Sequence, residues 1–177
     1  MAIDLTALTA GATWAVALGT VVILWWQVRV SQQLNSGNAV MALRERFEAP
    51  RLRRARRELS QRLLAGKHED ITSLEVAAFF ELVGALTHRK VLDRFMVWEA
   101  FGTWTTGYFY ALRHPVDVIG RARRELKDPL IMHEMEWLSA RVLEIDRRVL
   151  GSGDPSDAEQ SEGARILLQR EAELDIE

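Results

Sequence analysis

LTALTAGATWAVALGTVVILWWQV, the stretch from Leu5 to Val28, contains no charged side chain. As an α-helix its 24 residues reach about 36 Å, which exceeds the roughly 30 Å hydrocarbon core of a bilayer. A helix in the core of a soluble protein rarely stays uncharged for so long, because one of its faces meets water. This stretch therefore predicts a membrane-spanning helix.

A cleaved signal peptide is the main alternative, since it is also apolar and N-terminal. Its leading region is basic, whereas the charged side chain that precedes this stretch is Asp4. The apolar stretch is also longer than the central region of a typical signal peptide. We therefore interpret residues 1–30 as a transmembrane anchor that remains part of the protein.

Arginine distribution predicts the orientation of this anchor. Basic residues are concentrated on the side that follows it, namely Arg29, Arg44, Arg46, Arg51, Arg53, Arg54, Arg56 and Arg57. The positive-inside rule places this side in the cytoplasm and the N-terminus outside. Trp25 and Trp26 are of the residue type that anchors a span at headgroup depth, so we expect them at the inner interface. The expected location is the plasma (inner) membrane, crossed once.

Small residues recur at every fourth position of the anchor, at Ala7, Gly11, Ala15 and Gly19. On a helix these positions share one face, and small side chains let two spans approach closely. The pattern favours self-association or docking on another membrane subunit. Alanine is common throughout this half of the anchor, so chance is an equally good explanation of the stripe.

Composition limits the chemistry available to the remaining residues. The 177-residue chain contains no cysteine, which excludes disulfides, thiolate-held metals and cysteine nucleophiles. The segment from Arg29 to Lys67 contains ten basic and three acidic residues. The segment from Asp154 to Glu177 contains eight acidic and two basic residues. A basic segment near the anchor suits an anionic leaflet, and an acidic segment is repelled from it.

Helical periodicity predominates after the anchor, so we predict an all-α fold: one N-terminal transmembrane helix followed by a small cytoplasmic helical bundle. The expected domain covers residues 31–150, with a basic, membrane-proximal helix over 50–65. Further helices are expected over 38–47, 72–86, 93–112, 116–126 and 128–150. Their signals include Pro50, Gly66, a capping box from Thr72, Asp93, Asp128-Pro129 and Gly151.

Two segments have alternative interpretations. The stretch from Phe95 to Leu112 carries one charge, Glu99, so a second span is an alternative to the buried helix that its aromatic and threonine content favours. Residues 151–177 are small, polar and acidic at their start, which predicts a flexible acidic tail whose last part folds on a partner.

The arginine cluster RLRRARR at residues 51–57 is the strongest functional signal. We expect its helix to bury Leu52, Ala55, Leu59 and Leu63 while basic side chains face away. The candidate contacts for anionic inner-leaflet lipids are Arg51, Arg53, Arg54, Arg56 and Arg57. A merely solvated basic face is the alternative. Nucleic acid is not expected as a partner, because no aromatic residues are interleaved with the arginines.

No residue pattern indicates catalysis, a metal or a cofactor. The histidines are His68, His88, His114 and His133, and none belongs to a complete metal-binding motif. Nucleophilic triads and phosphate-binding loops are also missing from the sequence. Glu81 and Glu99 lie among apolar residues, so we expect each to pair with an arginine such as Arg94 or Arg113.

Three motifs accompany the N-terminal span: Arg53-Arg54-Ala55-Arg56, FFELVGAL from Phe79 to Leu86, and Met135-Glu136-Trp137-Leu138. Together they resemble a bacterial family of small single-span membrane proteins whose helical cytoplasmic domain has no known function. The resemblance covers roughly Leu5 to Val149. It implies a fold and a location, and it implies no activity.

We therefore expect a non-enzymatic, membrane-anchored protein-interaction or scaffolding module whose partners are the bilayer and an unidentified protein. An accessory single-span subunit of a larger membrane complex, held through the small-residue stripe, is the alternative. An enzyme with an unrecognised site ranks third.

Overall fold

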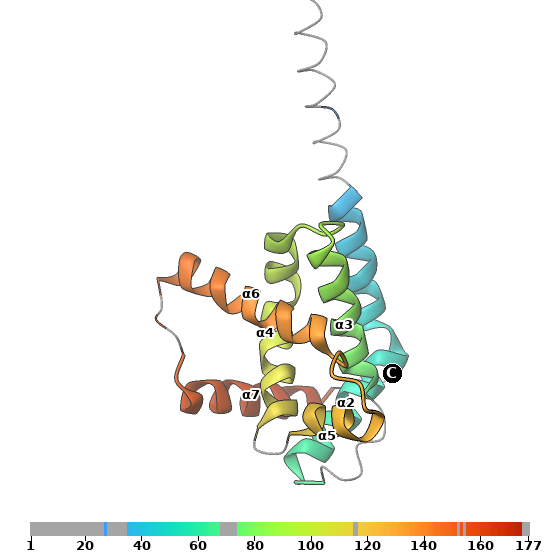
Figure 1. Cartoon of the computed structure of the whole chain (residues 1–177), viewed down its shortest axis with the longest axis vertical. Helices are drawn as coiled ribbons and strands as arrows, with labels where there is room; N and C mark the ends of the chain where they lie inside the picture. The colour runs from blue at the N-terminus through green and yellow to red at the C-terminus, as the bar shows by residue number, and fades with distance from the viewer. Residues whose placement is uncertain are drawn as a thin grey trace, which may run out of the picture.

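A computed structural model describes residue 27 and residues 35–67, 74–114, 117–151, 153 and 155–174. Within these ranges all regular structure is helical, which confirms the all-α class for the described part of the chain (Figure 1). A helix over residues 35–48 precedes the labelled helices. These are α2 (Pro50–Leu64), α3 (Glu75–His88), α4 (Arg94–Arg113), α5 (Val118–Leu126), α6 (His133–Leu150) and α7 (Asp157–Ala172).

The predicted anchor over residues 5–28 lies outside the described residues, apart from Gln27. Among the helices that are described, none combines the length and the apolar character that a bilayer crossing requires. A second span over Phe95 to Leu112 is therefore not supported. These residues belong to α4, which instead buries Val97, Phe101 and Tyr108 inside the domain.

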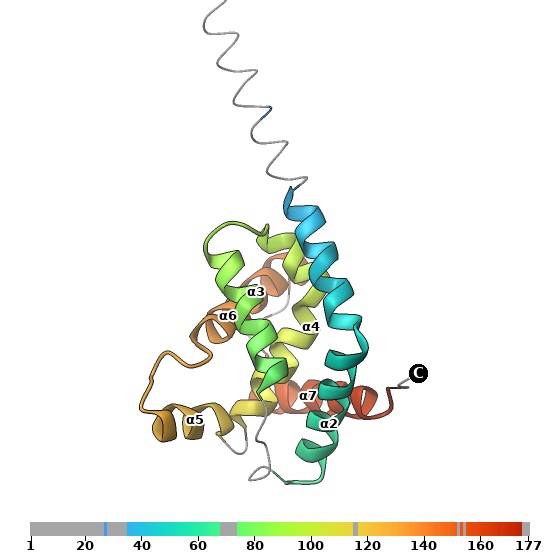
Figure 2. The ribbon, with the colours of Figure 1, turned by 90° about the vertical axis from the view of Figure 1, so that its right-hand side faces the viewer.

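The 35–48 helix, α3 and α4 run along the long axis of the domain, and α6 and α7 cross it (Figures 1 and 2). α3 and α4 both pack against α6, whereas α7 packs against α2 and α4. Phenylalanine rings fill the centre: Phe47, Phe79, Phe80 and Phe101 make contacts with centroids 5.2–5.8 Å apart. Such contacts are favourable beyond the apolar area they bury.

Local signals predict several helix ends correctly. Pro50 stands in the first turn of α2, where its missing N–H is no loss. Gly66 and Gly151 follow α2 and α6 in the left-handed region, at φ +69° and +63°, which glycine adopts without strain. The Asp93 carboxylate accepts hydrogen bonds from the N–H groups of Phe95 and Met96 at 2.9 and 3.1 Å, and so caps α4.

The predicted start of α6 at Asp128-Pro129 is wrong. Residues 129–132 form turns, Met132 adopts the left-handed region at φ +57°, and α6 begins at His133. The N–H of Met135 in its first turn donates to Oε2 of Glu81 at 2.8 Å. Glu81 was expected to pair with an arginine, but its carboxylate instead caps α6 from α3.

The flexible tail expected over residues 151–177 must be corrected for residues 157–172, which form α7. Ser156 and Glu159 make a reciprocal capping box at its start, and these hydrogen bonds lower the pKa of Glu159. Ala164, Leu167 and Leu168 are buried on the face that packs against α2 and α4. Most of the stability of a helix in a protein comes from such packing of its apolar face. The helical domain therefore extends to α7.

Candidate functional site

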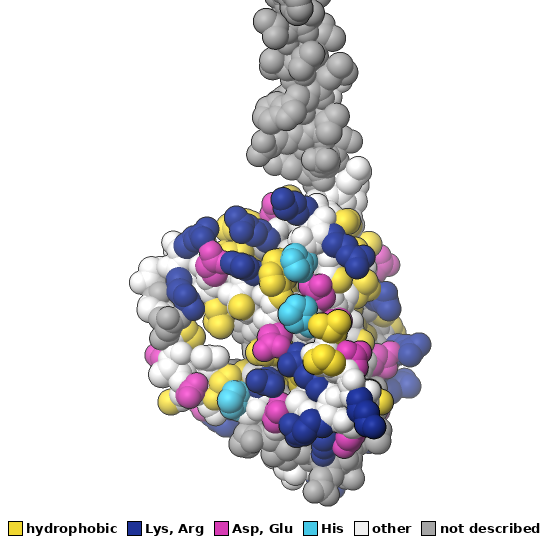
Figure 3. Space-filling view, viewed as in Figure 1, with side chains coloured by type: hydrophobic (Ala, Val, Ile, Leu, Met, Phe, Trp, Pro, Cys, Tyr) yellow, Lys and Arg dark blue, Asp and Glu magenta, His cyan; other side chains and the backbone are white. Residues whose placement is uncertain are grey.

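A cleft of about 640 Å³ opens between α4, the second half of α6 and the start of α7. Figure 3 shows the surface hollowed between α6 and α7. One face of α4 and one face of α6 form its walls, and the connector to α7 closes one end. The lining residues are Trp98, Glu99, Gly102, Thr103, Thr106, Leu143, Asp146, Arg147, Leu150, Gly153, Pro155 and Glu159. The volume is within the range of ligand-binding sites.

Several polar side chains of this cleft already have hydrogen-bond partners within the protein. Asp146 accepts a hydrogen bond from the indole N–H of Trp98 at 2.6 Å, and Glu159 is held in the capping box. Thr106 donates to the carbonyl oxygen of Gly102 at 3.1 Å. Glu99 is exposed, and among the described residues its carboxylate has no ion-pair partner. The lining therefore combines apolar side chains with the carboxylate of Glu99, which has no ion-pair partner among the described residues, and with the guanidinium of Arg147.

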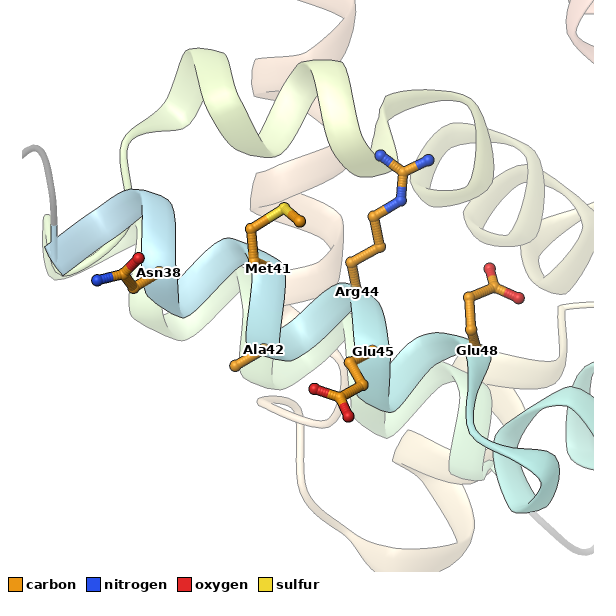
Figure 4. A pocket seen from close by; sticks show the side chains of 6 residues that line it. All are labelled: Asn38, Met41, Ala42, Arg44, Glu45 and Glu48. Carbon is orange, nitrogen blue, oxygen red and sulfur yellow. The ribbon is translucent and has the colours of Figure 1, made fainter.

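A second depression, of about 480 Å³, lies along the 35–48 helix (Figure 4). Its lining comes from that single helix and consists of Asn38, Met41, Ala42, Arg44, Glu45 and Glu48. In Figure 4 these side chains point to more than one side of the helix. A surface built from one element cannot enclose a small molecule, so the cleft beside α4 is the better candidate site.

A buried polar network joins α2, α4 and α7. The Arg56 side chain is 1% exposed, and its Nε atom lies 3.1 Å from Oε2 of Glu171, without the alignment of a hydrogen bond. The other oxygen of Glu171 accepts from the indole N–H of Trp104 at 2.9 Å. The Tyr108 hydroxyl donates to Oε2 of Glu171 at 3.1 Å and lies 3.3 Å from Oγ of Ser60. These contacts fix α7 to the rest of the bundle.

Burial raises the pKa of the Tyr108 phenol well above its usual range, and the nearby Glu171 carboxylate adds to the effect. An acid whose pKa is raised by folding ionises more readily in the unfolded chain. Its contribution to stability is therefore complete below pH about 10 and declines as the pH rises above that value.

We predict that Tyr108 does not ionise in the native protein. The chain has two tyrosines, so a Tyr110→Phe variant leaves the phenolate absorbance of Tyr108 alone. On alkaline titration this absorbance should rise only in the pH range in which circular dichroism reports unfolding. A reversible titration near pH 10 with a native spectrum would show that Tyr108 is accessible to solvent.

The five arginines proposed to contact lipid do not share one surface. Arg56 is buried, so the structure contradicts its place in that set. The Nε atom of Arg51 lies 2.6 Å from Oε1 of Glu75, and the Nε atom of Arg53 lies 4.0 Å from Oε2 of Glu48. Arg54 is exposed and Arg57 is half-buried. α2 is therefore a basic helix whose middle arginine belongs to the core.

The sequence also contains a signal for the Arg56–Glu171 pair, which is independent of the basic character of α2. Arg56 lies four residues after Leu52 and three before Leu59, on the apolar stripe of α2. Glu171 likewise extends the stripe of Ala164 and Leu167 on α7. A charge on each of two otherwise apolar stripes needs a partner, and the two charges have opposite signs.

The remaining predicted site residues cannot be placed. Ala7, Gly11, Ala15 and Gly19 lie outside the described residues, as do Trp25 and Trp26.

The histidines that the structure describes are not gathered in one place. The imidazole Nδ1 of His88 lies 2.9 Å from Oε2 of Glu134, and its ring stacks on Trp137 at 4.4 Å. His114 stacks on Tyr110 at 4.8 Å. Over the described ranges no group of three or more His, Asp or Glu side chains is arranged to hold a metal ion.

Comparison with known proteins identifies one family. A family model described as a domain of unknown function, DUF4760, matches residues 12–142. The resemblance to a family of unknown function is thereby confirmed. The matched range ends inside α6, before the connector and α7. No curated protein and no solved structure matches the chain.

Proposed function

The chain belongs to the DUF4760 family of unknown function, and from that premise we propose that it is a non-enzymatic protein-interaction module held at a membrane. In this proposal residues 5–28 cross the plasma (inner) membrane, and the helical domain lies on the cytoplasmic side. The uncharged run and the arginines that follow it support this placement.

The observation that carries the binding role is the cleft between α4 and α6. Leu150 at its rim is 68% exposed, and Leu143 and Trp98 extend the apolar lining inward. The exposed carboxylate of Glu99, which has no ion-pair partner in the described part of the chain, belongs to the same lining. Apolar side chains beside an exposed carboxylate suit a protein segment that presents apolar residues and a lysine or arginine.

Site-specific photocrosslinking in cells tests this role. A photoreactive amino acid at Thr103, inside the cleft, should crosslink to a defined partner. The same amino acid at Ala78, which is exposed on α3 outside the cleft, serves as the matched control and should not. Glu99→Lys combined with Leu150→Asp should abolish the Thr103 product. Equal crosslinking from both positions, or a bare monomer after purification in mild detergent, would contradict the proposal.

The alternative is an accessory subunit of a larger membrane complex, held through Ala7, Gly11, Ala15 and Gly19. Small residues on one face are how spans associate without a hydrophobic driving force. Gly11→Leu together with Gly19→Leu should then release the chain from its complex and leave the Thr103 crosslink intact. If the double substitution leaves the chain in its complex, the small-residue stripe does not hold it there, and the accessory-subunit alternative fails.

A further inference from the structure

The turn between α3 and α4 lies beside Ser36, close to where the described domain begins at residue 35. The backbone N–H of Asp93 in this turn donates to Oγ of Ser36 at 2.6 Å, and the Ser36 side chain is buried there. Six residues lie between Val28 and Asn35, so the seven steps from one to the other span at most about 25 Å. The turn is therefore tied to the end of the domain that stays nearest the membrane.

α2 lies at the opposite end of the domain. The 35–48 helix is about 21 Å long and leads directly into α2, which continues away from residue 35 (Figures 1 and 2). The exposed arginines of α2 are thus farther than the α3–α4 turn from residue 35, where the described domain begins. This geometry shifts the expected lipid contact from α2 to the turn.

The chemistry of the turn suits an anionic bilayer surface. Arg89, Lys90 and Arg94 are exposed, and within the described ranges none of them forms an ion pair. Val91 and Phe95 are 54% and 50% exposed and stand between these charges. Basic side chains attract anionic headgroups, and exposed apolar side chains enter the interface beneath them.

The three basic side chains and the one carboxylate, Asp93, leave residues 89–95 with a net charge of +2. Arg94 also lies near Glu144, whose pKa is lowered by a hydrogen bond from Arg141 and by the charges of Arg148 and Arg94. Asp93 is occupied in capping α4, where its oxygen accepts two backbone N–H groups. Lys90 adopts the left-handed region at φ +59°, which turns the chain sharply between α3 and α4. Figure 3 shows several Lys and Arg side chains over this end of the domain.

We propose that residues 89–95 are the surface by which the domain rests on the anionic leaflet that its own anchor enters. The occupant of this surface is the lipid headgroup layer, and the apolar contacts are Val91 and Phe95. The inference rests on the membrane anchoring proposed above, and it replaces α2 by the α3–α4 turn as the lipid-contacting element.

Single-cysteine labelling tests the proposal directly, because the natural chain has no cysteine. Full-length Val91→Cys and Arg54→Cys proteins carry the same fluorophore and are reconstituted into vesicles of phosphatidylglycerol and phosphatidylcholine. A nitroxide quencher on the lipid headgroup should quench the label at residue 91 strongly and the label at residue 54 weakly. Quenching of residue 54 instead, or of neither label, would overturn the proposal.

Charge removal provides the second measurement. Arg89→Gln with Lys90→Asn should shift the equilibrium between docked and undocked domain by about 30-fold, read from the quenching at residue 91. The matched control removes two charges from α2, Arg54→Gln with Arg57→Gln, and should leave that quenching unchanged. Equal loss in both variants would show that the domain senses only net charge and would overturn the role of the turn.

Resistance of the vesicle-bound chain to alkaline carbonate separates the two proposals. A chain that is extracted by carbonate contradicts the anchoring, and the docking surface fails with it. A chain that stays inserted while its label at residue 91 remains in water contradicts the docking surface alone.

Discussion

Arg56→Ala is expected to lower the free energy of unfolding of the helical domain by about 3–5 kcal/mol. The substitution removes a guanidinium that is 1% exposed and leaves the buried carboxylate of Glu171 without its countercharge. It also removes the stacking of this guanidinium on Phe47, whose ring centroid lies 3.8 Å from Cζ. Removal of one partner of a buried ion pair destabilises a protein more than replacement of both partners by apolar residues, because it leaves a buried charge without a countercharge.

Chemical unfolding of the full-length protein in mild detergent, followed by circular dichroism, measures this loss. Arg54→Ala is the matched control, since Arg54 is exposed on the same helix and should change stability by about 0.5 kcal/mol at most. Arg56→Met combined with Glu171→Leu removes both charges and should recover much of the loss. If Arg56→Ala and Arg54→Ala unfold at the same denaturant concentration, the buried pair does not hold α7 in place.

Gly84→Ala should be the second most damaging single change, at about 3 kcal/mol. A Cβ atom on Gly84 would lie 2.3 Å from the carbonyl oxygen and 2.7 Å from the carbonyl carbon of Glu134. Because these are backbone atoms of α6, no side chain can rotate to relieve the clash. The helices α3 and α6 must separate, which opens the core around Met135 and Val83.

Gly163→Ala provides the matched control, because Gly163 also lies inside a helix. A Cβ atom there meets nothing within 4 Å, so alanine should raise stability by about 0.5–1 kcal/mol through its better helix propensity. The same unfolding experiment compares the two variants. A stabilising effect of Gly84→Ala would mean that α3 and α6 do not approach as closely as described.

Features that one residue or a few neighbouring residues determine can be predicted from the sequence. Pro50, Asp93 and the glycines after α2 and α6 act through the backbone of their own turn, so their effects are visible in the sequence. The start of α6 is different, because it is capped by the carboxylate of Glu81, which precedes the donor residue Met135 by 54 positions and lies on α3. No local pattern encodes that contact.

The burial of α7 cannot be predicted from its own sequence for a related reason. Residues 157–172 contain many acidic and polar side chains, which is typical of a solvent-exposed segment. Their composition therefore does not predict that any side chain of this helix is buried. The stripe of Ala164, Leu167 and Leu168 gains meaning only when α2 and α4 present a complementary face. The cleft could not be predicted either, because it depends on how far the second half of α6 diverges from α7.

Topology labelling in intact cells examines most directly whether residues 5–28 hold this domain at a membrane. The chain lacks cysteine, so Ala2→Cys and Lys67→Cys each introduce a single reactive site on opposite sides of the proposed anchor. A membrane-impermeant maleimide should label residue 2 in intact cells and residue 67 only after the cells are opened, with both proteins in the membrane fraction. Labelling of residue 67 in intact cells, or recovery of the chain in the aqueous fraction, would contradict the anchored, cytoplasm-facing arrangement.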